Sequence, residues 1–256
     1  MIVSSGTKKP NIHASAYVAP SATVSGDVTI EEGCAVLFGA VISAEGAPVT
    51  IGANSVVMEN AVVKSSGGKV MQFPCSVGES CIIGPGAYIV GATIEPGAFI
   101  ASGARIFNGA TVEEGVSVAI GAIVHVNTRI KTGQHVPMLN IAHGDPATIY
   151  SPRQAGEVHG KMHFFQDVFN LPDSDDVRAK AAEGYSKFLR KTHAQDAAIA
   201  EAPKKAAPKP PQRKTEEPPP TQATEVEKVV DVIFVELEEA RLRRDAAIER
   251  EKKTKR

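Results

Sequence analysis

Branched aliphatic residues recur at every sixth position over long stretches of the first 136 residues. The longest unbroken run is Ile94, Ile100, Ile106, Val112, Val118, Val124, Ile130 and Val136. This period matches neither the turn of an α-helix nor the two-residue alternation of an ordinary strand. It is typical of a parallel β-helix, in which three short strands form one coil of about 18 residues and successive coils stack about 4.8 Å apart.

The same ladder extends upstream and is interrupted at three points. Its earlier members are Ile12, Val18, Val24, Ile30, Val36, Ile42, Ile51, Val57, Val63, Val77, Ile83 and Ile89. The intervals 42–51 and 63–77 are three and eight residues too long, and Ile94 comes one residue early. The fourth residue after a ladder position is repeatedly small, because little space remains beside an aliphatic stack. We therefore predict an all-β, single-stranded parallel β-helix of about six to seven coils over 1–150, followed by C-terminal α-helices.

The density of charge changes near residue 150. The first 150 residues hold 7 Lys and Arg and 10 Asp and Glu, whereas the rest of the chain holds 21 and 19. Such a shift predicts an architectural boundary. Over 151–200 we expect a connection and a helix that packs on the β-helix. Its start is expected at Asp173 or Ser174, because apolar residues then follow at three- and four-residue spacing from Val177 to Leu189.

The last part of the chain is expected to be a docking element on a spacer. The proline-rich composition of 201–223 is typical of an extended, semi-rigid linker. The segment 224–256 is predicted to be a charged amphipathic helix, with an apolar stripe at heptad-like spacing over Val226–Ala247. This helix either docks on its own protein or oligomer, or binds a protein partner to which the spacer lets it extend. Its basic residues alternate with acidic ones, which predicts a solvated face and no nucleic-acid partner.

The sequence also predicts the cellular compartment of the protein and the roles of its cysteines. There is no apolar run of about 18 residues and no leader pattern, so we expect a cytoplasmic protein without a membrane partner. Three cysteines without paired spacing argue against a disulfide framework. Cys34 and Cys81 occupy small positions beside the ladder and are predicted to fill the core. Cys75 falls in the long interval 63–77, where we expect a loop and a free thiol.

Residues 1–150 resemble the left-handed β-helix proteins of the hexapeptide-repeat superfamily and, within it, the γ-class carbonic anhydrases. The resemblance is carried by VISAEG at 41–46, NSVVMENAVVK at 54–64, VGESCIIGPGAYIVG at 77–91 and the closing 144–147. It implies a left-handed coil and a homotrimer. In active members of the family, three histidines at the interface between subunits hold zinc, which activates a bound water.

This chain departs from the family pattern at every zinc position. The resemblance places Lys64, Pro85 and Val90 where the three histidines would stand. The neighbouring positions are altered too, and are Ser43, Glu45, Met58 and Glu59 here. Neither proline nor valine can coordinate zinc, and lysine would have to be deprotonated to do so. We therefore expect no metal cofactor, no carbonic anhydrase activity, and a catalytically inactive trimer with a structural or docking role. Binding of a small ligand at the vestigial site is a further alternative.

An acyltransferase is the alternative, because hexapeptide-repeat enzymes commonly transfer acyl groups from coenzyme A. A histidine would then act as general base, within about 3 Å of the substrate proton. The insertion 64–76 contains no histidine, so the candidates are His125 and His143, and the cofactor would be acetyl-coenzyme A. Coil counting places His125 in one outward column with Lys64 and Val90, where a surface or interface role is the simpler expectation.

Overall fold

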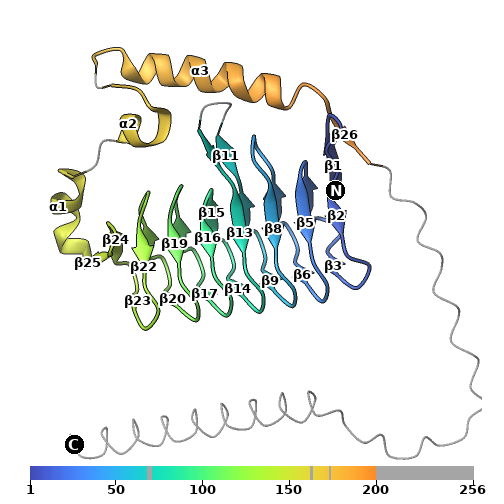
Figure 1. Cartoon of the computed structure of the whole chain (residues 1–256), viewed down its shortest axis with the longest axis horizontal. Helices are drawn as coiled ribbons and strands as arrows, with labels where there is room; N and C mark the ends of the chain where they lie inside the picture. The colour runs from blue at the N-terminus through green and yellow to red at the C-terminus, as the bar shows by residue number, and fades with distance from the viewer. Residues whose placement is uncertain (68–70, 162–163, 173, 200–256) are drawn as a thin grey trace, which may run out of the picture. The chain divides into compact units, whose positions relative to one another are not determined.

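A computed structural model of the chain describes residues 1–67, 71–161, 164–172 and 174–199. A parallel β-helix occupies most of this range, and short helices follow it (Figure 1). The predicted linker 201–223 and tail helix 224–256 lie outside the described residues. No helix within the described part is long and apolar enough to cross a membrane.

Three parallel sheets form the three faces of the β-helix. The first face contains β1 (Ile2–Ser5), β4 (Thr23–Ser25), β7 (Val41–Ser43), β10 (Val62–Lys64), β15 (Tyr88–Val90), β18 (Arg105–Ile106), β21 (Ile123–Val124) and β24 (Ile141–His143). The second contains β2 (Asn11–Ile12), β5 (Val28–Ile30), β8 (Val49–Ile51), β13 (Cys75–Val77), β16 (Thr93–Ile94), β19 (Thr111–Val112) and β22 (Arg129–Ile130). The third contains β3 (Tyr17–Val18), β6 (Ala35–Val36), β9 (Val56–Val57), β14 (Ile82–Ile83), β17 (Phe99–Ile100), β20 (Ser117–Val118) and β23 (His135–Val136).

The β-helix has slightly more turns than the six to seven predicted, since it forms about eight. Its first face stacks eight parallel strands, and the other two faces stack seven each. One addition is β1, where Ile2 pairs with Val24 although it lies ten residues before Ile12. The last rung holds Ala142 beside Val124, and this alanine keeps the six-residue spacing without a branched side chain. Both ends therefore continue the stack with residues that break the sequence pattern.

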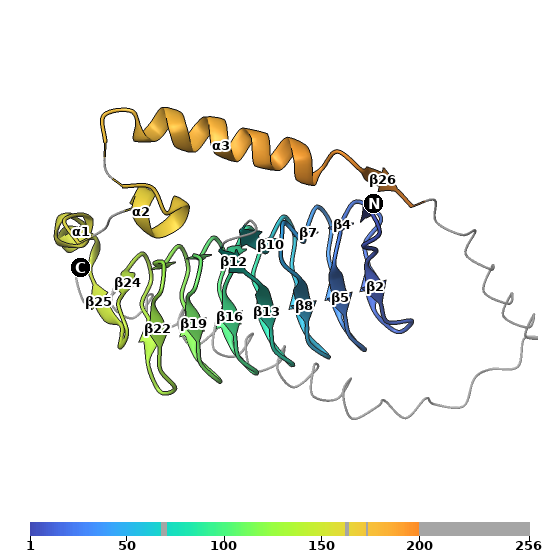
Figure 2. The same ribbon diagram turned by 45° about the horizontal axis from the view of Figure 1, so that its top comes forward.

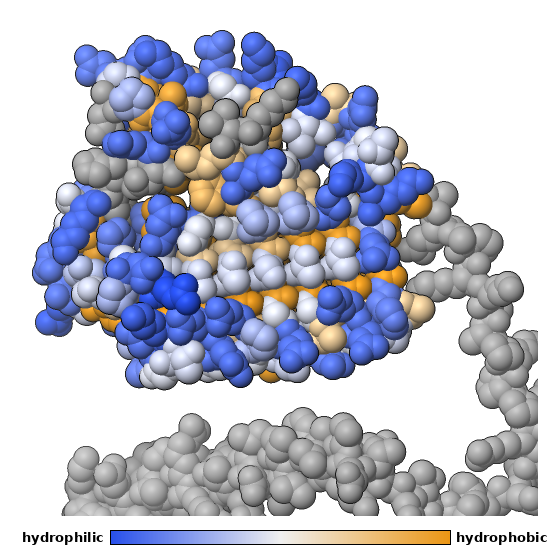
Figure 3. All heavy atoms as spheres, viewed as in Figure 1, coloured by the Kyte–Doolittle hydropathy of each residue, from blue (hydrophilic) through white to orange (hydrophobic). Residues whose placement is uncertain are grey.

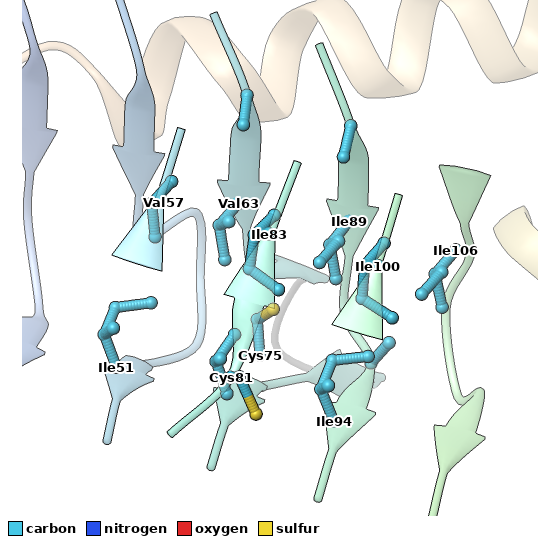
Figure 4. Close-up of a cluster of buried hydrophobic side chains, with 14 of the residues drawn as sticks. Ile51, Val57, Val63, Cys75, Cys81, Ile83, Ile89, Ile94, Ile100 and Ile106 are labelled. Atoms are coloured by element: carbon cyan, nitrogen blue, oxygen red, sulfur yellow. The ribbon is translucent and has the colours of Figure 1, made fainter. Parts of the chain in front are cut away.

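The ladder residues form the core. They point into the coil from all three faces (Figure 4), and those from Val24 to Val136 are at most 1% exposed. Burying each such side chain contributes about 1.5–3 kcal/mol, so the repeat supplies the main driving force for this fold. Cys34 and Cys81 are buried in the same core, as predicted.

Cys75 is a free thiol, as predicted, but its position differs from the prediction. It lies in β13 opposite Val49 and is 1% exposed, not in a loop. Burial raises the pKa of its thiol to about 12, which leaves it inert as a nucleophile. The extra residues of the interval 63–77 instead form a hairpin of β11 (Ser66–Gly67) and β12 (Gln72–Phe73).

The segment after the coils folds back along them. β25 (Thr148–Tyr150) pairs antiparallel with β24, and is followed by η1 (Pro152–Gln154), α1 (Ala155–His159) and α2 (Phe164–Phe169). The predicted helix is α3 (Val177–Thr192), which begins a few residues later than expected and lies alongside the coils (Figures 1 and 2). β26 (Asp196–Ala198) then pairs with β1. This return brings α2 and α3 beside the first face.

The outward side of the second face carries a row of uncharged residues, called here the uncharged ladder to distinguish it from the buried ladder of the core. The outward residues of five successive rungs are Thr29, Thr50, Ser76, Thr93 and Thr111. In Figure 3 this face shows near-neutral and apolar rows, with charged side chains gathered around them. A flat surface without charge in its centre can pack against another protein at a low desolvation cost.

Candidate functional site

The strand register of the first face confirms the predicted outward column and adds His143 to it. Successive members of the column are Ser25, Ser43, Lys64, Val90, Phe107, His125 and His143. Each follows a ladder residue directly, so each points away from the core. The column thus brings together two of the three predicted zinc positions and both candidate histidines.

An ion pair occupies the centre of this column. Lys64 Nζ lies 2.8 Å from Glu45 Oε1, and the side chains are 16% and 12% exposed. Glu45 comes from the three-residue insertion after β7. The Glu45 backbone N–H donates to Ser65 Oγ at 2.8 Å, and the Ser65 hydroxyl donates to the carbonyl of Ala47. Ser65 therefore holds the insertion against the next coil and places the carboxylate beside Lys64.

The ion pair also has a neighbour on α3. Burial lowers the pKa of Lys64, but the hydrogen bond and the charge of Glu45 outweigh burial, so the pKa is raised overall. Burial raises the pKa of the Tyr185 phenol; the positive charge of Lys64 opposes this shift, and the charge and hydrogen bond of Glu45 add to it. The geometry therefore keeps Lys64 protonated and the phenol neutral at ordinary pH, with Tyr185 coupled to both charges.

Aromatic rings continue the column toward the C-terminal coils. Ring centroids are 6.4 Å apart for Tyr88 and Phe107, 6.2 Å for Phe107 and His125, and 5.5 Å for His125 and His143. These spacings are typical of packed aromatic pairs. His125 is 8% exposed, so within one chain it lies in a packed stack and not on the open surface; the other expectation, a position in an interface, stays a prediction.

The remaining predicted positions lie at another corner. Pro85, Met58 and Glu59 occupy the turns that lead from the third face to the first. The N–H of Gly86 donates to the Glu59 carbonyl, and the N–H of Gly103 donates to the Pro85 carbonyl, so these turns stack on one another. Pro85 is separated from Val90 by the length of β15 and does not line the same surface as Lys64 within one chain.

The side chains at these positions do not suit a zinc ion. The ammonium of Lys64 has no lone pair while it is bound to Glu45, and valine and proline side chains carry no donor atom. Among the described residues, no group of three or more His, Cys, Asp and Glu side chains is arranged to hold a metal. In this part of the column, the single chain thus has an ion pair between Lys64 and Glu45 and no set of metal ligands among the described residues.

A cavity of about 570 Å³ lies beside the ion pair, between the first face and the helices α2 and α3. Lys64, Val90 and Phe107 line it from the β-helix, and Tyr185 and Phe188 line it from α3. Sequence reasoning missed this cavity. The only signal was the aromatic content of the segment after residue 160, which fitted simple packing of a helix equally well.

The sequence is similar to plant γ carbonic anhydrases. It is 33% identical to γ carbonic anhydrase 1 of Arabidopsis thaliana, a mitochondrial protein, over 199 residues, which cover 73% of this chain and 68% of that protein. It is 34% identical to the mitochondrial γ carbonic anhydrase 2 of the same plant over 131 residues, which cover 50% of this chain and 46% of that one.

Solved structures agree on the fold. A hexapeptide transferase family protein from Anaplasma phagocytophilum superposes with a TM-score of 0.50 at 17% identity, over 76% of this chain and 97% of that one. At this identity the likeness establishes a shared β-helix and nothing about activity. No family model matches the chain.

Proposed function

Because this chain belongs to the γ carbonic anhydrase family, we propose that it is a catalytically inactive member that works as a trimeric structural or docking protein. The ion pair between Lys64 and Glu45 carries this proposal. Zinc chemistry requires ligands with free lone pairs and an open position for water. Here a lysine ammonium is bound to one oxygen of a carboxylate, Oε1 of Glu45, where the family pattern expects a ligand.

The separation of Pro85 from Lys64 supports the trimer. In the family pattern, a ligand at the position of Pro85 and a ligand at the position of Lys64 meet only across a subunit interface. The corner that contains Pro85 also carries large apolar side chains on its surface: Phe38, Ile120, Met138 and Leu139 are 55%, 51%, 58% and 59% exposed. The N–H of Leu139 donates to the carbonyl of Ile120, so these two residues lie on successive coils, whereas Phe38 is several coils away. Neighbouring exposed apolar groups such as Ile120 and Leu139 are typical of interaction sites. A second copy covering this corner would bury them.

The docking role is supported by what the chain adds to the coils. The sequence of 201–256 combines a spacer with an amphipathic stripe, and the second face offers an uncharged ladder. Neither feature contributes to carbonic anhydrase chemistry. A trimer would present three copies of the tail, which raises the effective concentration of each docking event.

Acyl transfer from acetyl-coenzyme A is the weaker proposal. A general base must approach the substrate proton to within about 3 Å. His125 is instead packed between Phe107 and His143 in the ring stack. No specific contact in the described residues favours a coenzyme A site over the structural role.

Two measurements test the proposal. The full chain, reconstituted with excess zinc and dialysed, is expected to hold far less than one zinc per chain by mass spectrometry and to leave carbon dioxide hydration at the background rate. An active family member prepared in parallel is the positive control. Stoichiometric zinc with hydration activity would disprove the loss of catalysis.

The docking role needs a separate test. Lysate of the source cell is passed over the full chain and over a version ending at Ala200. A protein retained only by the full chain, and released by a peptide of residues 224–256, is the expected result. Identical eluates from the two versions would contradict a docking tail and leave the zinc result unaffected.

A further inference from the structure

The cavity beside α3 has the size and the walls of a ligand site. Its volume is about 570 Å³, within the range of about 300–1,000 Å³ that is usual for small-molecule sites. The space is a cleft that is partly open to solvent, so a ligand can enter it from outside. Val90, Phe107 and Val126 form the wall on the β-helix, and Phe169, Leu171 and Phe188 form the opposite wall.

The buried side chain of Asn108 borders this apolar space. Asn108 lines the cavity and is 8% exposed. Its Oδ1 atom is fully buried and has no hydrogen-bond partner among the described residues. The Oγ atom of Ser66, which also lines the cavity, is in the same condition. An unsatisfied buried polar group costs about 1–3 kcal/mol, so a bound O–H or N–H group that meets Asn108 Oδ1 after a rotation of that side chain would remove the penalty.

The charges at the wall do not favour an ion. The two lysines that line the cavity are both paired: Lys64 with Glu45 at 2.8 Å and Lys180 with Asp176 at 2.8 Å. An anionic ligand would therefore have to compete with the Glu45 carboxylate for the covered ammonium of Lys64, whereas the exposed pair of Lys180 and Asp176 offers little competition. An uncharged ligand gains the apolar contacts without that competition.

We propose that this cavity binds an uncharged apolar molecule, a ring system or a short chain, that carries one hydroxyl or N–H group. The head group donates to Asn108, and the apolar body fills the space between the aromatic side chains of the two walls. The proposal goes beyond the structural role: the walls named here come from one chain and involve no zinc, and in the proposed trimer the partner subunit would approach the cavity only at Lys64 and Val90.

Gly184 of α3 offers a way to fill the cavity without disturbing its walls. The glycine lines the cavity, and a Cβ atom added there meets no heavy atom within 4 Å. A larger side chain at this position would grow into the ligand space. Replacing a glycine inside a helix also raises helix propensity, so the variant is expected to keep or increase its stability.

The test uses the full chain and the fluorescent probe N-phenyl-1-naphthylamine, which is uncharged, aromatic and carries one N–H group. We expect a saturable rise in fluorescence with one probe per chain, reversed by 1-decanol far better than by decanoate at pH 8. Gly184→Phe is expected to weaken probe binding at least about 10-fold by occupying the site. Glu183→Phe, at an exposed neighbour on the same helix, is the matched control and should bind as the wild type does.

Asn108→Ala examines the head group separately. Loss of one hydrogen bond is expected to weaken the probe about 2- to 10-fold while the circular dichroism spectrum stays unchanged. If Gly184→Phe alters that spectrum, Gly184→Leu replaces it. The proposal is overturned by non-saturable fluorescence, by equal binding in the Gly184 and Glu183 variants, or by equal binding after Asn108→Ala. Better displacement by decanoate would overturn its uncharged character. None of these outcomes changes the zinc or docking results.

Discussion

The Nζ atom of Lys64 lies 2.8 Å from Oε1 of Glu45, and both side chains are largely covered. The two residues come from consecutive coils, and Tyr185 of α3 is coupled to both of them. The contact thus links the N-terminal coils to the returning helix. It places a charged pair at a position where the resemblance to the family puts a ligand, and we expect the stability of this region to depend on both side chains.

Removing one partner of the pair should be costly. Lys64→Met leaves the Glu45 carboxylate mostly buried without a cation, and we expect the free energy of unfolding to fall by about 2–4 kcal/mol. The double variant Lys64→Met, Glu45→Met should recover most of that loss, since an apolar pair carries no unpaired charge. Urea unfolding at one fixed protein concentration measures both effects.

A matched control for this cycle is available on the surface. Lys8 and Asp27 also lie 2.8 Å apart, but their side chains are 63% and 44% exposed. Lys8→Met is therefore expected to change stability by no more than about 1 kcal/mol. If Lys64→Met and Lys8→Met lowered the free energy of unfolding equally, the covered pair would stabilise the protein no more than the exposed pair does.

Alkaline pH should weaken the same region. The folded-state pKa values of Lys64 and Tyr185 are raised above their ordinary values of 10.5 and 10.0. A raised pKa means that the folded protein holds the proton more tightly, so this stabilisation is complete below the ordinary value and is lost as pH rises through the folded value. Thermal unfolding from pH 8 to 12 should show a decline that begins near pH 10. The decline should be smaller in the double variant Lys64→Met, Glu45→Met; an identical decline would exclude this pair as its source.

The repeat could be predicted because it is a local pattern. Apart from three interruptions, each ladder residue is six positions from the next, and all of them enter one core, so the sequence alone predicts both the fold and the outward column. The two ends were missed for the same reason. Ile2 precedes Ile12 by ten residues, and Ala142 keeps the spacing without the branched side chain that marks a rung.

The site depended on contacts between distant segments. The approach of Glu45 to Lys64 depends on how a three-residue insertion folds and on Ser65, which holds it. Cys75 was expected in a loop because the hairpin that absorbs the extra residues gave no signal of its own. The cavity exists only because α2 and α3 return across the first face. Periodicity cannot predict such tertiary contacts.

A rebuilt zinc site would test the assignment of positions directly. The variant Lys64→His, Pro85→His, Val90→His is expected to bind zinc at close to one per chain, because three neutral imidazoles suit a tetrahedral site with one open position. The control Lys64→His, Val90→His lacks the ligand from the corner of Pro85. It should hold zinc at least about 10-fold more weakly, since two ligands rarely retain the metal. Equal affinity in the two variants would mean that Pro85 is not a ligand position.

The apolar corner makes the most direct prediction about assembly. If copies of the chain cover this corner, light scattering of the wild type should give about three times the chain mass of 26.9 kDa. Ile120 and Leu139 are 51% and 59% exposed in one chain, so a carboxylate at either position is compatible with the folded coil. Inside an interface the same carboxylate would be desolvated without a partner. Ile120→Glu and Leu139→Glu are therefore expected to shift the mass to that of one chain.

The control places a carboxylate elsewhere on the coils. Lys131→Glu changes an exposed residue at the corner between the second and third faces, and the trimer mass should persist. The far-ultraviolet circular dichroism of all three variants should match the wild type, because the ladder is untouched. A trimer mass that survives both Ile120→Glu and Leu139→Glu would place the interface on another surface. The uncharged ladder of the second face would then be the next surface to alter, since it also lacks charges that resist burial.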